Sequence, residues 1–180
     1  MPHLIKIPDN IDEIIFSKEA LPLPSSSKRL RMLLYLLNIP FLTSYCITLI
    51  KNFLELPKST SLVPGFKCIV GNIFCGEHVG LFDTLFVDYA PIYIGNNVGF
   101  SYRNILLTST HDFGNFQKVI AKPIIIEDNV WITSNVTILP GVRIGENSII
   151  GAGSVVTKDI PKNVFAAGNP CRVIKNIHRL

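Results

Sequence analysis

Four histidines are the side chains of this sequence best suited to move protons near neutral pH, because imidazole titrates there. His111 directly follows the polar run Thr108–Thr110 and begins a stretch in which the pattern of the sequence breaks down. An imidazole in such a place can accept the proton of a hydroxyl group and make its oxygen a better nucleophile. His78 occupies an expected turn, and His3 and His178 lie near the chain ends, so these three are interpreted as structural or solvated residues.

The spacing of histidines and cysteines gives little indication of a metal site. His78 and His111 are 33 residues apart and lack the close pairing of ligands that a zinc site needs, so we expect no metal. None of the four cysteines stands in a C-x-x-C pair, and we interpret them as reduced thiols: Cys46, Cys68, Cys75 and Cys171.

Two carboxylates, Asp83 and Asp88, lie in the segment before His111. A carboxylate accepts hydrogen bonds through both oxygens and is therefore well suited to hold a ligand rich in hydroxyl groups. Each of the two residues can equally be a solvated turn residue. Both remain candidates for a binding site.

The element that must position these residues is a repeat with a period of six. Aliphatic residues recur at every sixth place after Pro123: Ile126, Ile132, Ile138, Ile144, Ile150 and Val156. A helix would need apolar spacings of three and four, and an isolated strand would show alternation alone. A short strand followed by a tight turn satisfies the period, and hexapeptide repeats of this kind are typical of β-helices. We therefore predict an all-β solenoid.

The same repeat is expected to begin near Cys68, before the most regular stretch. The phrase Ile73–Leu81 recurs as Ile92–Phe100 after 19 residues, where three hexapeptides would give 18. We place the extra residue in Asp88–Pro91 and predict a β-bulge there, a feature that often re-aims side chains near active sites. The predicted inward series is Ile69, Cys75, Leu81, Val87, Ile94, Phe100 and Leu106.

The period is lost after Leu106 and returns at Ile126, so residues 108–122 are predicted to form an extruded loop that carries His111. Insertions in repeat proteins map to one face and often bind a ligand. Pro161 is expected to end the coils. The tail Phe165–Lys175 should fold back along the solenoid and end in a short helix.

The N-terminal part has a different character. Residues 1–25 contain four prolines and are expected to form an irregular arm, after which Ser25–Ser27 can cap a helix. We predict two helices, 28–38 and 41–55, separated at Pro40, and we divide the chain into an arm with a helical cap (1–66) and the solenoid (67–180). The favoured role of the helices is to cover the open end of the solenoid. The alternative is peripheral contact of residues 28–55 with a membrane through the cluster Lys28-Arg29-x-Arg31.

Net charge, the distribution of basic residues and the N-terminal sequence limit the ligands and the cellular location expected for this protein. The net charge of +4 is modest, and basic residues form no stripe with aromatics among them, so nucleic acid is not an expected partner. Mild basicity suits an anionic small ligand. Met1–Ile11 lacks the pattern of a signal peptide, which together with the cysteines leads us to expect a cytoplasmic protein, with the inner membrane surface as the alternative location.

Three segments carry a resemblance to a known family: Val130–Val136, Leu139–Pro161 and Ala167–Ile174, the last with its Gly-Asn-Pro-Cys-Arg-Val-Ile ending. Residues 68–175 resemble the hexapeptide-repeat acyltransferases, and the three segments are similar to the galactoside and maltose O-acetyltransferase branch. The His111-Asp-Phe loop is more similar to acetyltransferases of exopolysaccharide synthesis, such as the colanic acid enzymes. The resemblance implies a left-handed parallel β-helix, an exception to the usual right-handed crossover.

By the same resemblance, the expected activity is acetyl-CoA-dependent O-acetylation of a sugar hydroxyl, in surface polysaccharide biosynthesis. N-acetylation of a nucleotide-linked amino sugar and a non-enzymatic hexapeptide scaffold remain the alternatives. Family members are homotrimers with active sites between subunits, so the same assembly is expected here. No serine or cysteine lies in a nucleophile motif, which favours direct transfer over an acyl-enzyme.

The resemblance also assigns roles to individual residues. His111 matches the catalytic base, and its ring could be held by Asp112 or by a backbone carbonyl. The acceptor-binding residues Asp83 and Asp88 are expected from their position and from the chemistry of carboxylates. The resemblance does not supply them, because Leu81 stands where the galactoside and maltose enzymes have an asparagine. The implied acetyl-CoA-binding residues, with Lys158 and Arg172 as cations for phosphates, are Trp131, Ser134, Ala152, Thr157, Lys158 and Arg172.

Overall fold

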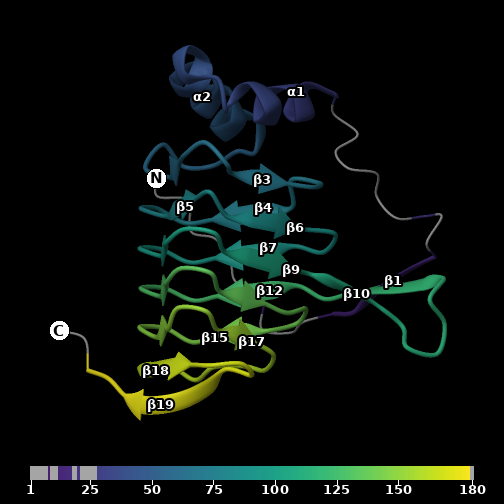
Figure 1. Cartoon of the computed structure of the whole chain (residues 1–180), viewed down its shortest axis with the longest axis vertical. Coiled ribbons are helices and arrows are strands. Elements are labelled where there is room, and N and C mark those ends of the chain that lie inside the picture. The colour runs from purple at the N-terminus through teal and green to yellow at the C-terminus, as the bar shows by residue number, and fades with distance from the viewer. Residues whose placement is uncertain (1–7, 9–11, 18–19, 21–27, 179–180) are drawn as a thin grey trace.

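The computed structural model describes residues 8, 12–17, 20 and 28–178 of the chain (Figure 1). The expected cap Ser25–Ser27 and the terminal His3 lie outside these residues. The chain forms a parallel β-solenoid of about six turns, with two short helices over its first coil and the C-terminal strand at its other end.

Three walls of parallel strands make up the solenoid, and each of the first four coils contributes one short strand to each wall. The first wall contains β2 (Ser61–Leu62), β5 (Gly80–Phe82), β8 (Gly99–Phe100), β13 (Trp131–Ile132), β16 (Ile149–Ile150) and β18 (Val164–Ala167). The second contains β3 (Lys67–Cys68), β6 (Leu85–Val87), β9 (Ile105–Leu107), β14 (Thr137–Ile138) and β17 (Val155–Val156). The third contains β4 (Ile73–Cys75), β7 (Ile92–Ile94), β12 (Ile124–Ile126) and β15 (Arg143–Ile144).

Each hexapeptide from Ile126 to Val156 forms one wall of a coil and turns the predicted aliphatic side chain into the core. Ile126 pairs with Ile94 on one side and with Ile144 on the other, and all three are fully buried. The first strand to join the ladder is β2, which pairs with β5, so the coils begin before the expected Cys68. The division of the chain after residue 66 stays a prediction.

Two members of the predicted inward series are wrong, Ile69 and Val87. Cys68 and Phe86 point into the core in their place, and the Phe86 ring packs 5.7 Å from Phe66 and 6.1 Å from Phe100 between ring centroids. Adjacent apolar residues made the two registers indistinguishable by hydropathy, and the larger ring occupies the core.

The predicted bulge at Asp88–Pro91 is also wrong. The extra residues there are accommodated in a turn, and the ladder beyond it keeps its register from Ile73↔Ile92 to Cys75↔Ile94. The register shift occurs instead between Ser61 and Leu62, opposite Gly80–Phe82. The ladder is therefore irregular one coil earlier than expected.

The tight turns between walls need left-handed backbone conformations, which asparagine tolerates better than most residues. One corner is a column of such residues: His78, Asn97, Asn129, Asn147 and Asn163, with φ between 56° and 60°. Amide side chains link neighbouring coils along this column, for example Asn147 to Asn163 at 3.0 Å. The prediction that His78 is a turn residue is confirmed.

The helical cap consists of α1 (Lys28–Leu36), the short η2 (Pro40–Leu42) and α2 (Thr43–Phe53), with the break at Pro40 as predicted. Leu30 is fully buried, and a Cβ built on Gly71 of the first coil would lie 3.7 Å from Leu30 and 2.9 Å from Leu54. The cap therefore seals the end of the solenoid. Among the described residues no single helix is long and apolar enough to cross a membrane. Taken together, α1 and the segment Pro40–Phe53 have the length and composition of a membrane span, but they are bent by 119° with respect to each other.

The extruded segment is a hairpin of β10 (Ser109–His111) and β11 (Lys118–Ala121), to which β1 (Ile14–Ser17) adds a third strand (Figure 1). The irregular arm predicted for residues 1–25 is thus wrong for residues 14–17, which form a strand antiparallel to β11. The predicted C-terminal helix is wrong as well. The tail does fold back, but as β19 (Arg172–Asn176), antiparallel to β18.

Candidate active site

His111 is the last residue of β10 and stands exposed on the hairpin, outside the solenoid. Its Nδ1 lies 2.8 Å from the carbonyl oxygen of Phe116, and the two rings are 6.0 Å apart between centroids. A carbonyl oxygen only accepts hydrogen bonds, so Nδ1 must carry the proton. The neutral ring then keeps the lone pair of Nε2 available, which is the arrangement that a general base requires.

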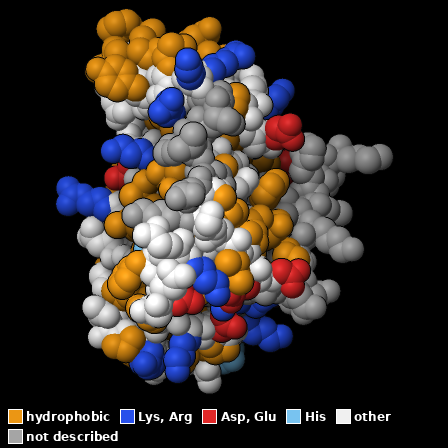
Figure 2. All heavy atoms as spheres, turned by 90° about the vertical axis from the view of Figure 1, so that its right-hand side faces the viewer, with side chains coloured by type: hydrophobic (Ala, Val, Ile, Leu, Met, Phe, Trp, Pro, Cys, Tyr) orange, Lys and Arg blue, Asp and Glu red, His pale blue; other side chains and the backbone are white. Residues whose placement is uncertain are grey.

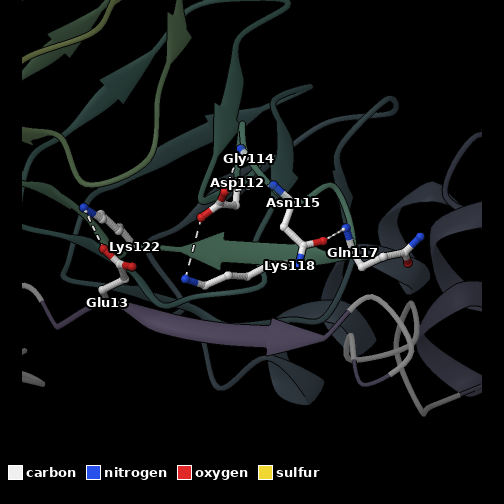
Figure 3. Close-up of polar contacts among 7 residues, drawn as sticks. All are labelled: Glu13, Asp112, Gly114, Asn115, Gln117, Lys118 and Lys122. Carbon is white, nitrogen blue, oxygen red and sulfur yellow. Dashed lines mark hydrogen bonds and ion pairs between the residues drawn. The ribbon is translucent and has the colours of Figure 1, made fainter.

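Asp112 supports the turn of the hairpin instead of the imidazole of His111. One of its oxygens accepts hydrogen bonds from the amides of Gly114 (2.8 Å) and Asn115 (3.0 Å), and the other lies 3.6 Å from Nζ of Lys118 (Figure 3). The amide of Gly114, followed by the other donors, lowers the pKa of this carboxyl group. Of the two partners considered for the ring of His111, the backbone carbonyl is the one observed.

The base of the hairpin is tied to the N-terminal strand. Nζ of Lys122 lies 3.0 Å from the carboxylate of Glu13 (Figure 3), and β1 pairs with β11 from Ile14↔Ala121 to Ser17↔Lys118. Lys122 also packs on the solenoid, because a Cβ on Gly141 would lie 3.1 Å from its side chain. These contacts set the orientation of the strand pair that carries His111.

Trp131 and Ala152 line one hollow of about 490 Å³ on the outer face of the first wall. Trp131 is flanked by Gly99 and Ile149 in the ladder, its side chain is 43% exposed, and its Nε1 donates to Oγ of Ser101 at 3.3 Å. Lys175 also lines this hollow, which is completed by residues that the sequence did not indicate: Thr133, Ile149, Gly151, Phe165 and Ile177. Ile149 and Phe165 precede the buried residues Ile150 and Ala166 by one place, as Trp131 precedes Ile132, and this position in the repeat is the signal that could have found them.

A second hollow, of about 420 Å³, brings Asp83 and Ser134 together with Tyr102, Arg103 and Asn135. Asp83 is partly exposed and accepts a hydrogen bond from the backbone amide of Arg103 at 2.8 Å. One predicted acceptor residue and one predicted donor residue therefore share a surface at the corner between the first and second walls.

Asp88 has a structural position that excludes ligand binding, so its assignment to the acceptor site is wrong. The residue is fully buried. One carboxylate oxygen accepts from the amides of Ile69 (2.8 Å) and Val70 (3.0 Å), and the other from Gly71 and Asn72 (2.6 Å each). The carboxylate closes the turn of the preceding coil and has no free face for a ligand.

The remaining predicted residues lie at other edges. Thr157 and Lys158 follow β17 at the corner between the second and third walls. The His111 hairpin leaves the solenoid at the same corner, two coils earlier, which is a distance of about 10 Å along the solenoid axis. Arg172 is exposed at the start of β19, and its guanidinium donates to the carbonyl of Cys171 at 2.7 Å. The single chain thus gathers the predicted residues in pairs and does not bring all of them to one pocket.

None of the four cysteines, all of which lie in the described part of the chain, offers an exposed thiol for catalysis. All four cysteines are free and buried, and burial is the main cause that raises the pKa of Cys68 and of Cys171 and raises that of Cys75 to about 11. No group of three or more His, Cys, Asp or Glu side chains that could hold a metal occurs among the described residues. A larger cavity of about 910 Å³, near Lys51 and Glu77, contains none of the predicted site residues.

Comparison with known proteins relates these features to a family. The family model described as bacterial transferase hexapeptide (six repeats) matches residues 123–158. The crystal structure of a maltose O-acetyltransferase from Clostridium difficile 630 superposes with a TM-score of 0.74 at 37% identity, over 83% of this chain and 85% of that one. The chain belongs to the hexapeptide-repeat acyltransferases. With that family it shares the left-handed parallel β-helix, as the resemblance implied.

Two further members of the hexapeptide-repeat acyltransferases show how far the similarity extends. The galactoside O-acetyltransferase of Lactococcus lactis subsp. lactis (strain IL1403) is 41% identical over 135 residues, 71% of this chain and 65% of that protein. A galactoside acetyltransferase in complex with coenzyme A superposes with a TM-score of 0.69 at 37% identity, over 83% of this chain and 80% of that one. The chain spans less than two thirds of the length of the curated relatives that it matches, 65% in the Lactococcus protein.

Proposed function

We propose that this protein transfers an acetyl group from acetyl-CoA to a hydroxyl group of a sugar. The observation that carries the proposal is the imidazole of His111, exposed on the hairpin with Nδ1 bound to the Phe116 carbonyl and Nε2 free. The similarity to galactoside and maltose O-acetyltransferases supports the choice of donor and of acceptor class.

In the proposed reaction His111 acts as general base and then as general acid. Nε2 accepts the proton of the sugar hydroxyl while the hydroxyl oxygen attacks the thioester carbon. His111 then donates that proton to the departing thiolate, so the products are the acetyl ester and free coenzyme A. The Phe116 carbonyl stabilises the imidazolium that forms between the two steps, because the protonated ring keeps its hydrogen bond through Nδ1.

For the donor we propose the hollow beside Trp131 and the cations around it. The apolar lining from Trp131 and Ala152 suits the pantetheine arm, and Lys158 and Arg172 are exposed cations suited to phosphates. Ser134 and Thr157 are assigned to the same donor by their match to the family. Lys175 lines the Trp131 hollow and adds a further cation there.

For the acceptor we propose a saccharide held partly by Asp83, within surface polysaccharide biosynthesis. Asp83 is partly exposed in the hollow that also contains Tyr102 and Arg103, and it retains one carboxylate oxygen beyond the bond to the Arg103 amide. A carboxylate that accepts from hydroxyl groups suits a sugar ring.

We also propose that the protein is a cytoplasmic homotrimer. The hairpin with His111 and the Trp131 hollow belong to different walls of one chain, so a second copy that meets the hairpin would bring base and donor together. Closed three-fold assemblies are common among homo-oligomers. The free cysteines fit a reducing compartment.

Replacement of His111 tests the mechanism. In His111→Ala we expect kcat to fall by about 10²–10⁴-fold, because a positioned base contributes that much, while calorimetry gives an unchanged affinity for acetyl-CoA. Release of coenzyme A is followed with galactosides and maltose and with amino sugars that offer a free amine. His178→Ala, at an exposed histidine near the C-terminus, is the matched control and should leave kcat unchanged.

Three outcomes would contradict the proposal. Undiminished turnover in a folded His111→Ala variant would remove His111 as the base. A preference for the amine acceptors would replace O-acetylation by N-acetylation. Absence of acetyl-CoA binding by the unaltered protein would leave a scaffold rather than an enzyme.

A further inference from the structure

The helical cap, residues 28–54, has two apolar faces, and sealing the solenoid uses only one of them. The inner face is buried against the first coil and consists of Leu30, Leu33, Leu37, Cys46 and Ile50. The outer face lies in solvent, with exposed fractions of 55% for Met32, 77% for Tyr35, 85% for Phe41 and 65% for Tyr45. These four residues are called the outer cap face.

The spacing of these residues places them on one end of the molecule. Met32 and Tyr35 are three residues apart on α1 and therefore share a side of that helix, and Tyr45 follows Phe41 by four. Phe41 lies in η2, at the elbow where α1 and the segment Pro40–Phe53 meet at 119°. Figure 2 shows apolar side chains gathered at the helical end of the molecule, with Lys and Arg side chains beside and below them.

The charge of the cap has one sign. Residues 28–54 contain four basic residues, Lys28, Arg29, Arg31 and Lys51, and no Asp or Glu. The formal net charge of the whole chain is also +4, from 17 basic and 13 acidic residues, so the remaining 13 basic and 13 acidic residues balance. Lys51 lines the cavity that also contains Glu77, and its Nζ donates to the carbonyl oxygen of Lys58 at 2.7 Å. The exposed cations of the element that carries the outer cap face are therefore Lys28, Arg29 and Arg31.

We infer that the outer cap face docks on an anionic lipid bilayer. Phenylalanine and tyrosine side chains favour the membrane interface, and a helix with apolar residues on one side and Lys and Arg beside them is typical of proteins that lie on a membrane surface. Each cation near an anionic surface adds to the attraction. A second copy of the cap is a poor occupant in comparison, because two surfaces that each carry Lys28, Arg29 and Arg31 repel one another.

The bound orientation follows from the fold. The cap closes one end of the solenoid and the strand β19 lies at the other, so docking through the cap leaves the coils and the His111 hairpin in the aqueous phase (Figure 1). The hairpin leaves the third coil, at a height of about 15 Å above the cap by the spacing of parallel strands.

Vesicle flotation of the full chain tests this inference. We expect binding to vesicles in which about a third of the lipid is phosphatidylglycerol, weak binding to phosphatidylcholine alone, and loss of binding at high salt. Tyr35→Ser with Phe41→Ser should lower the partition coefficient more than about tenfold, because the apolar contact is removed. Arg29→Gln with Arg31→Gln should lower it at least about tenfold.

Matched controls come from the coils. Ile174→Ser removes an exposed apolar side chain of β19, and Lys67→Gln with Lys162→Gln removes two exposed cations from the solenoid; neither should change binding. Circular dichroism verifies that each variant is folded. Equal flotation of cap and control variants, or no flotation of the unaltered chain with anionic vesicles, would overturn the inference. An assembly in size-exclusion chromatography that only the cap variants break, without vesicle binding, would identify a second copy as the occupant and overturn it too.

Discussion

Replacement of Asp88 by asparagine separates a structural role of this residue from a role in binding the acceptor. The carboxylate is fully buried and accepts four backbone amide hydrogens, two at each oxygen. An asparagine of the same shape has only one oxygen. Whichever way the amide is turned, its NH2 group faces two backbone donors of residues 69–72, and those donors lose their acceptor.

The size of the effect follows from the number of bonds lost. Hydrogen bonds to a charged group contribute about 1.5–3 kcal/mol each, so the loss of two lowers the free energy of unfolding by about 3–6 kcal/mol. Domains of this kind are stable by about 5–15 kcal/mol, so the variant should still fold at low temperature. With a urea m-value of about 3 kcal/mol/M, the midpoint should fall by about 1–2 M.

Asp83→Asn is the control for this measurement. Its single bond, from the amide of Arg103, can be kept by the amide oxygen of asparagine, so the change in the free energy of unfolding should be below about 1 kcal/mol. Urea unfolding is followed by far-ultraviolet circular dichroism and by the fluorescence of Trp131. An Asp88→Asn variant with unchanged midpoint and a raised KM for the sugar would refute the structural role.

Two further predictions concern the donor hollow and a buried thiol. In Ala152→Phe a ring fills the hollow beside Trp131, so the KM for acetyl-CoA should rise about tenfold or more with an unchanged unfolding midpoint, whereas an unchanged KM would place the donor elsewhere. Burial raises the pKa of Cys75 from 9.0 to about 11, so its contribution to stability is complete below pH 9 and is lost as the pH rises to 11. The urea midpoint should therefore fall over that range, and less so in Cys75→Ser; an equal fall in both proteins would contradict it.

The regular coils could be predicted from the sequence because each wall turns a large aliphatic side chain into the interior at the same place of every hexapeptide. From Ile126 to Val156 the predicted inward residues are the observed ones, because Thr137 before Ile138 and Arg143 before Ile144 are polar and fix the phase of the repeat. Where two apolar residues are adjacent, as at Phe86 and Val87, hydropathy does not choose between them. The choice was made by packing against Phe66 and Phe100, residues one coil away on either side.

The surroundings of the site were less predictable because they depend on pairings between distant segments. Asp88 looked like a ligand-binding carboxylate, since nothing local reveals that the amides of residues 69–72 converge on it. The strand Ile14–Ser17 was read as an irregular arm, because its partner β11 lies about a hundred residues later. His111 was placed correctly in the insertion, whereas the partner of its ring was decided by the turn that returns Phe116 to it.

The three-stranded sheet around the hairpin has a consequence for anyone who exchanges loops between relatives of this protein. The segment that carries His111 does not hold its orientation alone, since β1 pairs along the whole of β11 and Glu13 is bound to Lys122. A graft of residues 108–122 would move two strands of a three-stranded unit and leave the third behind. The portable module is therefore discontinuous: it comprises residues 12–17 together with the hairpin, and a chimera should inherit both from the same parent.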